Sequence, residues 1–270
     1  MIELEKKYQL KVKKFGPINW IGFKTLLAKE ISRFMIVWVQ TILSPLVSSL
    51  LFLAVLSLAI GNERGDVLGF PFITFLAPGL IAMSVIQQGF SHSVSSIMIA
   101  KIQGNIIDTL MAPLSDAEVT LAIIFAAVTR SIIILIASVL VFSLIIEINF
   151  YSIFYVLIGT FFGSFILGTL GFITGQFALK FDHTAAVTNF IITPASFLSG
   201  VFYTTDRLPA LFQTISNWNP FFYIIDITRY GFLGKSDGNI FFGVGYLAII
   251  SLALWLLCWY LYKIGWKLKS

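Results

Sequence analysis

Residues 119–146 read VTLAIIFAAVTRSIIILIASVLVFSLII, and Arg130 is the one charged side chain among them. A helix rises about 1.5 Å per residue, so about 20 apolar residues cross a hydrocarbon core about 30 Å thick. This stretch is therefore long enough to span a membrane. Five others have the same character: 35–60, 72–95, 153–178, 185–201 and 240–266. The sequence predicts an all-α membrane protein with six transmembrane helices.

The composition agrees with a chain that has lipid as its main solvent. Hydrophobic residues make up 58% of the 270 residues and charged residues 11%, and the mean hydropathy is +0.92. A soluble domain of this size carries about 25% charged residues. We expect a polar basic segment at 1–17, followed by one transmembrane domain at 18–270.

The basic residues are distributed by side of the membrane, which argues against a nucleic-acid footprint. By the positive-inside rule, the side that holds most of them is the cytoplasm. With an even number of spans, both termini then lie in the cytoplasm. Thirteen of the 18 basic residues fall on this side: Lys6, Lys7, Lys11, Lys13, Lys14, Lys24, Lys29, Arg33, Lys101, Lys180, Lys263, Lys267 and Lys269.

An amphipathic helix is predicted ahead of the first span, at 18–33. A helical wheel gathers its large apolar side chains on one stripe, as in helices that lie in the membrane interface. The alternative is a cytosolic lead-in helix that packs on other helices. The stripe contains Trp20, Phe23, Leu27, Ile31 and, just beyond the helix, Phe34.

The loop at 101–117 predicts a short amphipathic helix that stands out from the cytoplasmic face. Asn105 is placed to cap it, Pro113 limits it, and Ser115 with Glu118 forms a capping box for the third span. Such a knob is shaped to dock into a groove on a partner, although a simple interfacial turn fits the same pattern. Its apolar residues are Ile106, Ile107, Leu110 and Met111.

Between the fifth and sixth spans the chain stays apolar and aromatic instead of becoming hydrophilic. Pro209 and Pro220 suit the first turns of two short helices, and Asp226 can pair with Arg229 three positions on. We expect two re-entrant helices that dip into the outer leaflet. A seventh crossing is the alternative, but it would leave the basic cluster at 263–269 outside.

Two spans carry distinctive small or helix-breaking residues. Pro78, followed by Gly79, predicts a kink or local break in the second span. The fourth span has a face of Ser164, Gly168, Gly171 and Gly175, with a Gly-x-x-x-Gly pair at 159 and 163 before it. Small residues let helices approach closely in lipid, so this face is expected to serve helix packing.

The motifs of common enzymes are missing from the sequence. It contains no G-x-x-x-x-G-K-[ST] phosphate loop, no H-E-x-x-H and no G-x-S-x-G. Cys258 is the single cysteine; no acidic residue lies close to His92 in sequence, and His183 has only its neighbour Asp182. We therefore expect no catalytic residues, no metal site and no cofactor in this chain.

Arg130 is the one charge at depth in a predicted span, and such groups are functional candidates by default. In one hypothesis it faces a cavity that receives an anionic headgroup. In the other it bonds to carbonyl and hydroxyl groups of neighbouring helices.

Taken together, these features resemble the permease subunit of ABC-2 type transporters, in detail the YadH-like inner-membrane permeases of bacteria. The resemblance runs from about Trp20 to the C-terminus. It is carried by the segments 29–34 (KEISRF), 75–80 (FLAPGL), 105–113 (NIIDTLMAP), 198–203 (LSGVFY), 219–220 (NP) and 229–234 (RYGFLG).

The resemblance implies an exporter in the bacterial inner membrane, with two copies of this chain above two separate ATPase subunits that hold ATP and magnesium. Residues 105–114 would be the coupling helix and 18–33 the interface helix. The segment 208–233 would hold the re-entrant gate, with Tyr203, Asn219, Pro220, Asp226 and Arg229 as its residues. The cargo would be amphipathic or lipid-linked: a lipid, a glycolipid or polysaccharide, or a drug.

Two other function classes fit six spans: a carrier driven by ion gradients, and a membrane scaffold with no ATPase partner. The carrier needs several acidic groups or a proton relay within the membrane, whereas these spans offer only Arg130 at depth. Co-purification of a soluble ATPase distinguishes the exporter from both alternatives.

Overall fold

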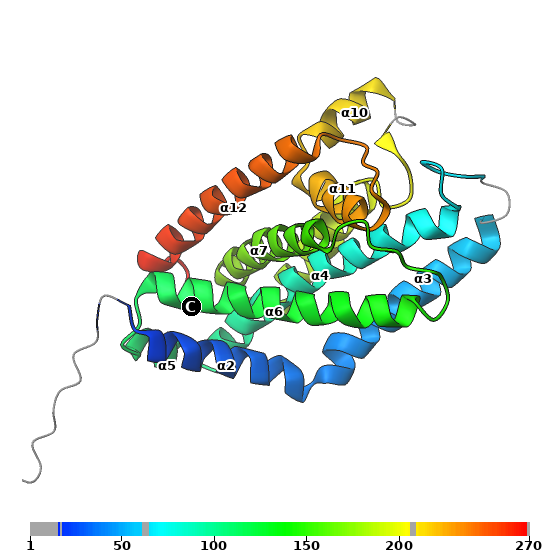
Figure 1. The fold of residues 1–270 in the computed structure, drawn as a ribbon. Coiled ribbons are helices and arrows are strands. Elements are labelled where there is room, and N and C mark those ends of the chain that lie inside the picture. The colour runs from blue at the N-terminus through cyan, green and yellow to red at the C-terminus, as the bar shows by residue number, and fades with distance from the viewer. Residues whose placement is uncertain (1–15, 17, 61–64, 206–208, 269–270) are drawn as a thin grey trace, which may run out of the picture.

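The computed structural model describes residues 16, 18–60, 65–205 and 209–268. In these ranges the regular elements are helices, joined by loops (Figure 1). Their one β contact is an isolated bridge between Val67 and Phe70. The polar segment predicted at 1–17 lies, except for Gly16, outside the described residues. The elements are α2 (Trp20–Ile36), the π-helix η1 (Val39–Leu43), α3 (Ser44–Ile60), α4 (Phe72–Ile102), α5 (Ile106–Met111), α6 (Asp116–Phe142), α7 (Ile153–Phe177), α8 (Phe181–Val187), the π-helix η2 (Thr188–Ile192), α9 (Thr193–Phe197), α10 (Ala210–Asn217), α11 (Pro220–Leu233) and α12 (Ile240–Lys263).

Within the described ranges, five helices are long and apolar enough to cross a membrane. They are Val39–Ala59, α4, α6, α7 and α12. The predicted span at 185–201 is not among the five. In that region α8, η2 and α9 follow one another directly and form a continuous helical segment. This segment ends at Phe197, before the predicted end of the span at 201.

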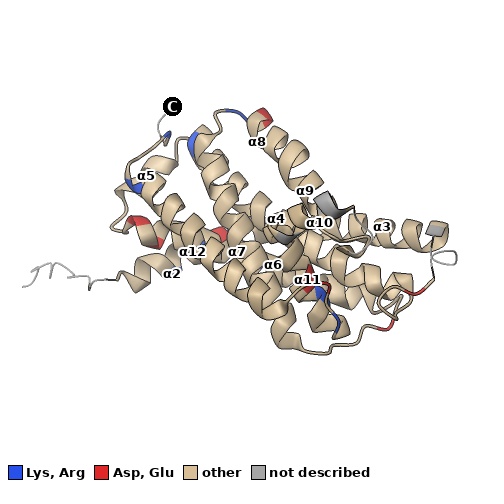
Figure 2. Ribbon diagram, turned by 90° about the horizontal axis from the view of Figure 1, so that it is seen from above, with Lys and Arg blue, Asp and Glu red and all other residues tan. Residues whose placement is uncertain are grey.

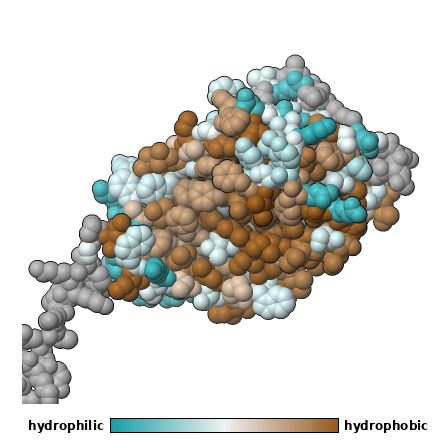
Figure 3. Space-filling view, viewed as in Figure 1, coloured by the Kyte–Doolittle hydropathy of each residue, from teal (hydrophilic) through white to brown (hydrophobic). Residues whose placement is uncertain are grey.

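Helix α4 lies at the centre of the bundle and packs on α3, α6, α7 and α11 (Figure 1). In α4, 72% of the apolar stretch is buried, against 17% in Val39–Ala59 and 22% in α12. The two latter helices lie on the outside and present apolar side chains outward. Figure 3 shows the resulting hydrophobic surface across one face of the molecule.

The small residues of α7 bring it close to two different neighbours, as the sequence predicted. A Cβ atom added to Gly171 would collide with the carbonyl oxygen of Phe90 in α4, and one added to Gly175 would lie 2.8 Å from Ile97 Cβ. One added to Gly163 would lie 2.7 Å from Ile224 Cγ2 in α11. The packing role of these glycines is confirmed, because larger side chains would separate the helices.

The loops gather at two ends of the bundle. We call one the α5 end, because α5, the start of α2 and the C-terminus lie there (Figures 1 and 2). At this end Lys101 Nζ donates to the carbonyl oxygens of Gln176 (2.7 Å) and Ala178 (2.8 Å) at the end of α7. At the opposite end, the α11 end, Lys235 lies 5.9 Å from the centre of the Phe70 ring.

Three local predictions about proline and capping are corrected by the structure. Helix α4 continues through Pro78, so of the predicted kink or local break the break does not form; packing on four neighbours holds the helix where one backbone bond is missing. Pro209 is the N-cap of α10, one position before its first turn, whereas Pro220 does begin α11. Asn105 precedes α5, but its side chain makes no capping bond and donates to Gln103 Oε1 at 3.2 Å.

Candidate functional site

Helix α5 forms a knob between α4 and α6, and it is anchored by one side chain. Ile106 is buried against Leu26 of α2 and Val119 of α6. The other apolar side chains point outward: Ile107 is 54% exposed, Leu110 40% and Met111 81%. Asn105 and Pro113, at the two sides of the helix, are exposed as well. An anchored helix with an apolar outer face is the geometry of a docking element.

A set of hydrogen bonds that we call the Asn19 clamp joins α2 to the turn after α5. The backbone N–H of Asn19 donates to Glu118 Oε1 at 2.5 Å, and its side-chain amide donates to Pro113 O at 2.9 Å. Glu118 Oε2 accepts from Ser115 N at 2.7 Å, which completes the predicted capping box. The knob is therefore attached to the starts of both α2 and α6.

Helix α2 packs on α6 through a face that the predicted apolar stripe did not identify. Its buried side chains are Leu26, Glu30 and Phe34, whereas Trp20 is exposed and Phe23, Leu27 and Ile31 are half-buried. The stripe residues Trp20, Phe23 and Leu27 instead line an apolar groove of about 660 Å³ against Leu121 and Phe125 of α6. Only Phe34 of the stripe enters the interior.

Arg130 bonds to neighbouring helices. Its guanidinium group donates to the side-chain oxygen of Gln88 in α4, and at 3.5 Å to the carbonyl oxygen of Thr41 in η1. Arg130 is buried and does not line the cavity beside it. This geometry supports the hypothesis of bonding to neighbours over the hypothesis of a headgroup ligand.

Gln88 also lines a polar cavity of about 360 Å³, which we call the α3–α4 groove. Eight of its 13 lining residues carry hydroxyl or amide groups and none is charged. Gln40 lies in the π-helix η1 and Thr193 directly follows the π-helix η2; π-turns within helices are frequent at functional sites. The lining is Gln40, Ser44, Pro45, Ser48, Ser49, Phe52, Leu80, Met83, Ser84, Gln87, Gln88, Thr193 and Phe197.

In α11 the expected ion pair between Asp226 and Arg229 is not formed, because each side chain binds a different loop. Asp226 accepts from the backbone N–H groups of Asp237 (2.8 Å) and Gly238 (3.0 Å). Burial raises the pKa of its carboxyl group. Arg229 donates to Gly200 O at 2.6 Å and lies 4.0 Å above the ring centre of Phe75.

Other residues of the predicted gate also hold the chain around α11. Asn219 caps α11 by accepting from Phe221 N at 3.0 Å, and its amide donates to Ser199 Oγ at 2.9 Å. Tyr203 donates its hydroxyl proton to Leu198 O at 2.7 Å. The predicted gate residues thus fall in two places. Pro220, Asp226 and Arg229 lie in α11, and Asn219 is its N-cap. Tyr203 lies in the turn 198–203. Residues 206–208, where the predicted gate segment begins, lie outside the described residues.

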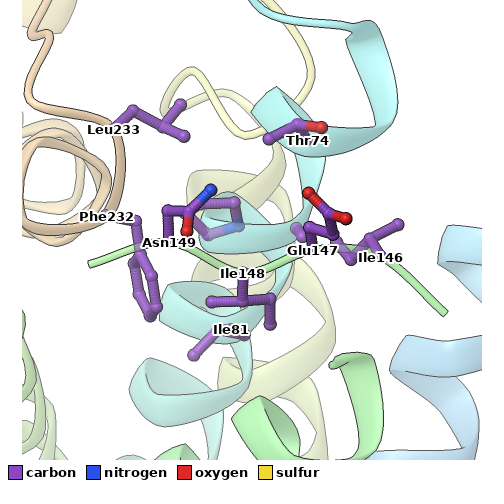
Figure 4. Close-up of a pocket in the computed structure, with 10 residues that line it drawn as sticks. Thr74, Ile81, Ile146, Glu147, Ile148, Asn149, Phe232 and Leu233 are labelled. Atoms are coloured by element: carbon purple, nitrogen blue, oxygen red, sulfur yellow. The ribbon is translucent and has the colours of Figure 1, made fainter. Parts of the chain in front are cut away.

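A narrow cleft at the α11 end separates α4 and α11 from the loop after α6 (Figure 4). Glu147 and Asn149 of that loop lie near Thr74 and Ile81 of α4 and Phe232 of α11. Its volume of about 10 Å³ has room for about one water molecule. It is too small to hold a cargo molecule.

The model of the family described as "ABC-2 type transporter" matches residues 21–233. This chain belongs to the ABC-2 type transporter family. The match runs from the second residue of α2 to the last residue of α11. With five candidate membrane spans, this ABC-2 family member is a multi-pass membrane protein.

Among its curated relatives, two match most of this ABC-2 protein and a third matches a smaller part of it. The "Inner membrane transport permease YadH" of Escherichia coli (strain K12) is 34% identical over 94% of this chain and 99% of its own. "Nodulation protein J" of Rhizobium leguminosarum bv. viciae is 24% identical over 87% and 90%. "Capsule polysaccharide export inner-membrane protein BexB" of Haemophilus influenzae is 30% identical over 40% of each chain.

The sequence alone missed one group of polar residues in this ABC-2 protein. Glu30 of α2 is buried beside His92 of α4, 3.8 Å from carboxylate oxygen to Nε2. No acidic residue lies close to His92 in sequence, so this pair was not predicted. The sequence contained one sign of this group. Glu30 lies four positions from both Leu26 and Phe34, so its carboxylate shares one face of the helix with two large apolar side chains.

Proposed function

We propose that this chain is the membrane-spanning permease of an ATP-binding cassette exporter in the bacterial inner membrane. Two copies form a homodimer, and two copies of a separate ATPase subunit bind ATP and magnesium beneath it. The chain itself has no catalytic role. Closure of the ATPase subunits moves α5, and the spanning helices tilt to open a path for an amphipathic or lipid-linked cargo.

The observation that carries this proposal is the geometry of α5. Ile106 holds the helix to the bundle while Ile107, Leu110 and Met111 are exposed on its outer side. Exposed apolar side chains on an anchored helix suit a groove on a protein partner. The Asn19 clamp connects this helix to α2, the proposed interface helix, so a push on α5 reaches two helices at once.

A sixth crossing by α8, η2 and α9 is supported by the positions of its two ends. Ala178, just before this run, binds Lys101 at the α5 end. Gly200, just after it, binds Arg229 of α11. The chain between them therefore runs along the bundle, and six crossings place both termini on one side. The concentration of lysines at the α5 end supports the cytoplasm as that side.

The α3–α4 groove is the proposed place where cargo contacts the permease. Its hydroxyl and amide groups suit a neutral headgroup rich in hydrogen-bonding groups, and Phe52 and Phe197 suit an apolar portion. Ser44 and Ser48 are exposed, so the groove lies at the surface where a second copy can close it. The relative whose name includes capsule polysaccharide export supports a glycan or glycolipid among the candidate cargoes.

The segment from Tyr203 to Arg229 is the proposed exit gate. Asn219 and Arg229 bind the turn 198–203 and hold α11 beside the outer part of α4. In this proposal α10 and α11 are re-entrant and narrow the exit between the two copies.

Purification and reconstitution test the proposal. The chain is purified from native membranes and its co-eluting proteins and lipids are identified by mass spectrometry. A stoichiometric soluble ATPase and a co-eluting amphiphile are expected. In vesicles, uphill flux of that amphiphile should require the ATPase and ATP. Uphill flux by the permease alone would establish a gradient-driven carrier, and absence of an ATPase would favour a scaffold.

A further inference from the structure

Four polar side chains meet where α2 crosses α4, and we call them the α2–α4 polar cluster: Glu30, Arg33, His92 and Ser96. The Glu30 carboxylate accepts from Ser96 Oγ at 2.8 Å and from Arg33 Nε at 3.0 Å. Arg33 also donates to the carbonyl oxygen of His92 at 3.5 Å. Glu30 is 4% exposed and His92 is fully buried.

This cluster holds a second potential hydrogen-bond donor to the same carboxylate group, the ring of His92. Neither ring nitrogen of His92 has a hydrogen-bond partner in the described part of the chain. His92 Nε2 lies 3.8 Å from the Glu30 oxygen that Ser96 and Arg33 now occupy. A small shift of α2 along α4 would exchange the Ser96 contact for a His92 contact. Such an exchange would give the cluster the two discrete arrangements that energetic coupling between sites requires.

Helix α2 connects this cluster to the knob as one unbroken helix. The Asn19 clamp fixes its first turn to Pro113 and Glu118. Glu30 lies 11 positions further along, which is about 17 Å at 1.5 Å per residue. A movement of α5 is therefore carried to α4 by a rigid element fixed at both points.

From the end of α2, further contacts reach the wall of the α3–α4 groove. Thr41 Oγ1 donates to Phe34 O at 3.0 Å, and Arg130 donates to Thr41 O at 3.5 Å. Arg130 also binds the side-chain oxygen of Gln88, which lines the groove. One continuous set of contacts thus joins the knob to the groove.

We propose that Glu30 is the positioning residue that transmits movement of α5 to α4 and the α3–α4 groove, through its hydrogen bond with Ser96. This inference rests on the proposed function, since it needs an ATPase that moves α5. Glu30 touches neither the ATPase nor the cargo in this proposal. Its loss therefore separates nucleotide hydrolysis from the response of the groove.

The test uses a cargo-independent probe of the groove. Ser48→Cys is introduced into a Cys258→Ala chain, so that a small maleimide reports access to one thiol. The labelling rate is measured on the permease with its co-purified ATPase, with and without ATP and vanadate. In this reference protein we expect the rate to change about tenfold or more, as for a typical coupling between two sites.

Glu30→Ala should remove most of the nucleotide-dependent change while the ATPase still co-purifies and hydrolyses ATP. Ser96→Ala should act in the same way, and the double variant should be no worse than either single one. Glu30→Gln, which retains an acceptor for Ser96, should restore most of the response. Ser32→Ala, an exposed change two positions along α2, is the matched control.

The outcomes separate the inference from the proposed function. A full nucleotide response in Glu30→Ala or, should that variant not fold, in Ser96→Ala overturns the role of Glu30 and leaves the exporter intact. Failure of Glu30→Gln to restore the response overturns the Ser96 route. Absence of an ATPase, or of any nucleotide response in the reference protein, overturns the proposed function and the inference with it.

Discussion

Asn19 and Glu118 are 99 positions apart in sequence, and the backbone N–H of Asn19 donates to Glu118 Oε1 at 2.5 Å. The same carboxylate group caps α6 through Ser115. One side chain therefore fixes the first turns of two helices that flank α5. The side-chain amide of Asn19 adds a bond to Pro113 O, which joins the predicted coupling element to the predicted interface helix.

Glu118→Ala should destabilise the protein, because it leaves the N–H groups of Asn19 and Ser115 without their acceptor. The expected loss is about 1–3 kcal/mol of unfolding free energy, measured by thermal unfolding in detergent. Glu118→Gln keeps one acceptor oxygen and should lose less. Equal stability of the alanine variant and the unaltered protein would show that the clamp contributes nothing.

Met111→Asp should weaken binding of the ATPase without affecting the fold, because Met111 is 81% exposed on the outer side of α5. An aspartate in an apolar groove on the partner loses its hydration without a counter-charge. We expect at least about tenfold less co-purified ATPase, equivalent to about 1.4 kcal/mol, at unchanged thermal stability. Leu110→Asp should uncouple hydrolysis from transport.

Gln103→Asp, an exposed change just before α5, is the control for these two variants. Normal ATPase binding and normal coupling in both the Met111 and Leu110 variants would remove α5 from the proposed interface.

Arg229→Leu should destabilise the α11 end, because it removes the donor to Gly200 O and Val201 O and the cation above Phe75. Removing one partner of a buried charged contact costs about 3–5 kcal/mol. Thermal unfolding and the yield of monodisperse protein measure the effect. Lys235→Leu, at an exposed position in the following loop, is the control and should stay near the unaltered protein.

Arg130→Glu should reduce the yield of folded protein, because Arg130 is buried and bonds to Gln88 and Thr41. The new carboxylate would face two acceptor oxygens, at a cost of about 3–5 kcal/mol. Size-exclusion chromatography of the purified variant measures the outcome. Normal yield and stability with lost transport would instead support a cavity that receives an anionic headgroup.

Gly171→Ala should separate α4 from α7, because an added Cβ would collide with the Phe90 carbonyl oxygen. Overpacking of this kind costs about 1–3 kcal/mol, read from thermal unfolding. Gly245→Ala in α12 is a matched control, since an added Cβ there meets no atom within 4 Å. A similar stability for the two variants would mean that the helices adjust without cost.

The sequence predicted the membrane class and most of the helices because the signals are local. Five apolar stretches became helices long enough to span, the Ser115 capping box formed as expected, and the glycines of α7 face neighbouring helices. In lipid, backbone groups must be satisfied within a helix, so hydrophobicity and length already fix much of the secondary structure. Pro78 shows the limit: the local sequence predicted a kink or a local break there, but α4 continues through it.

Only the tertiary structure decided which polar groups meet. Asp226 and Arg229, three positions apart, bind two different loops, whereas Glu30 meets Ser96 across 66 positions. Helix packing removes water from buried polar groups, and each must then find whichever partner lies within reach. Local sequence sets which helices form, but the distances between side chains on different helices exist only once those helices have packed.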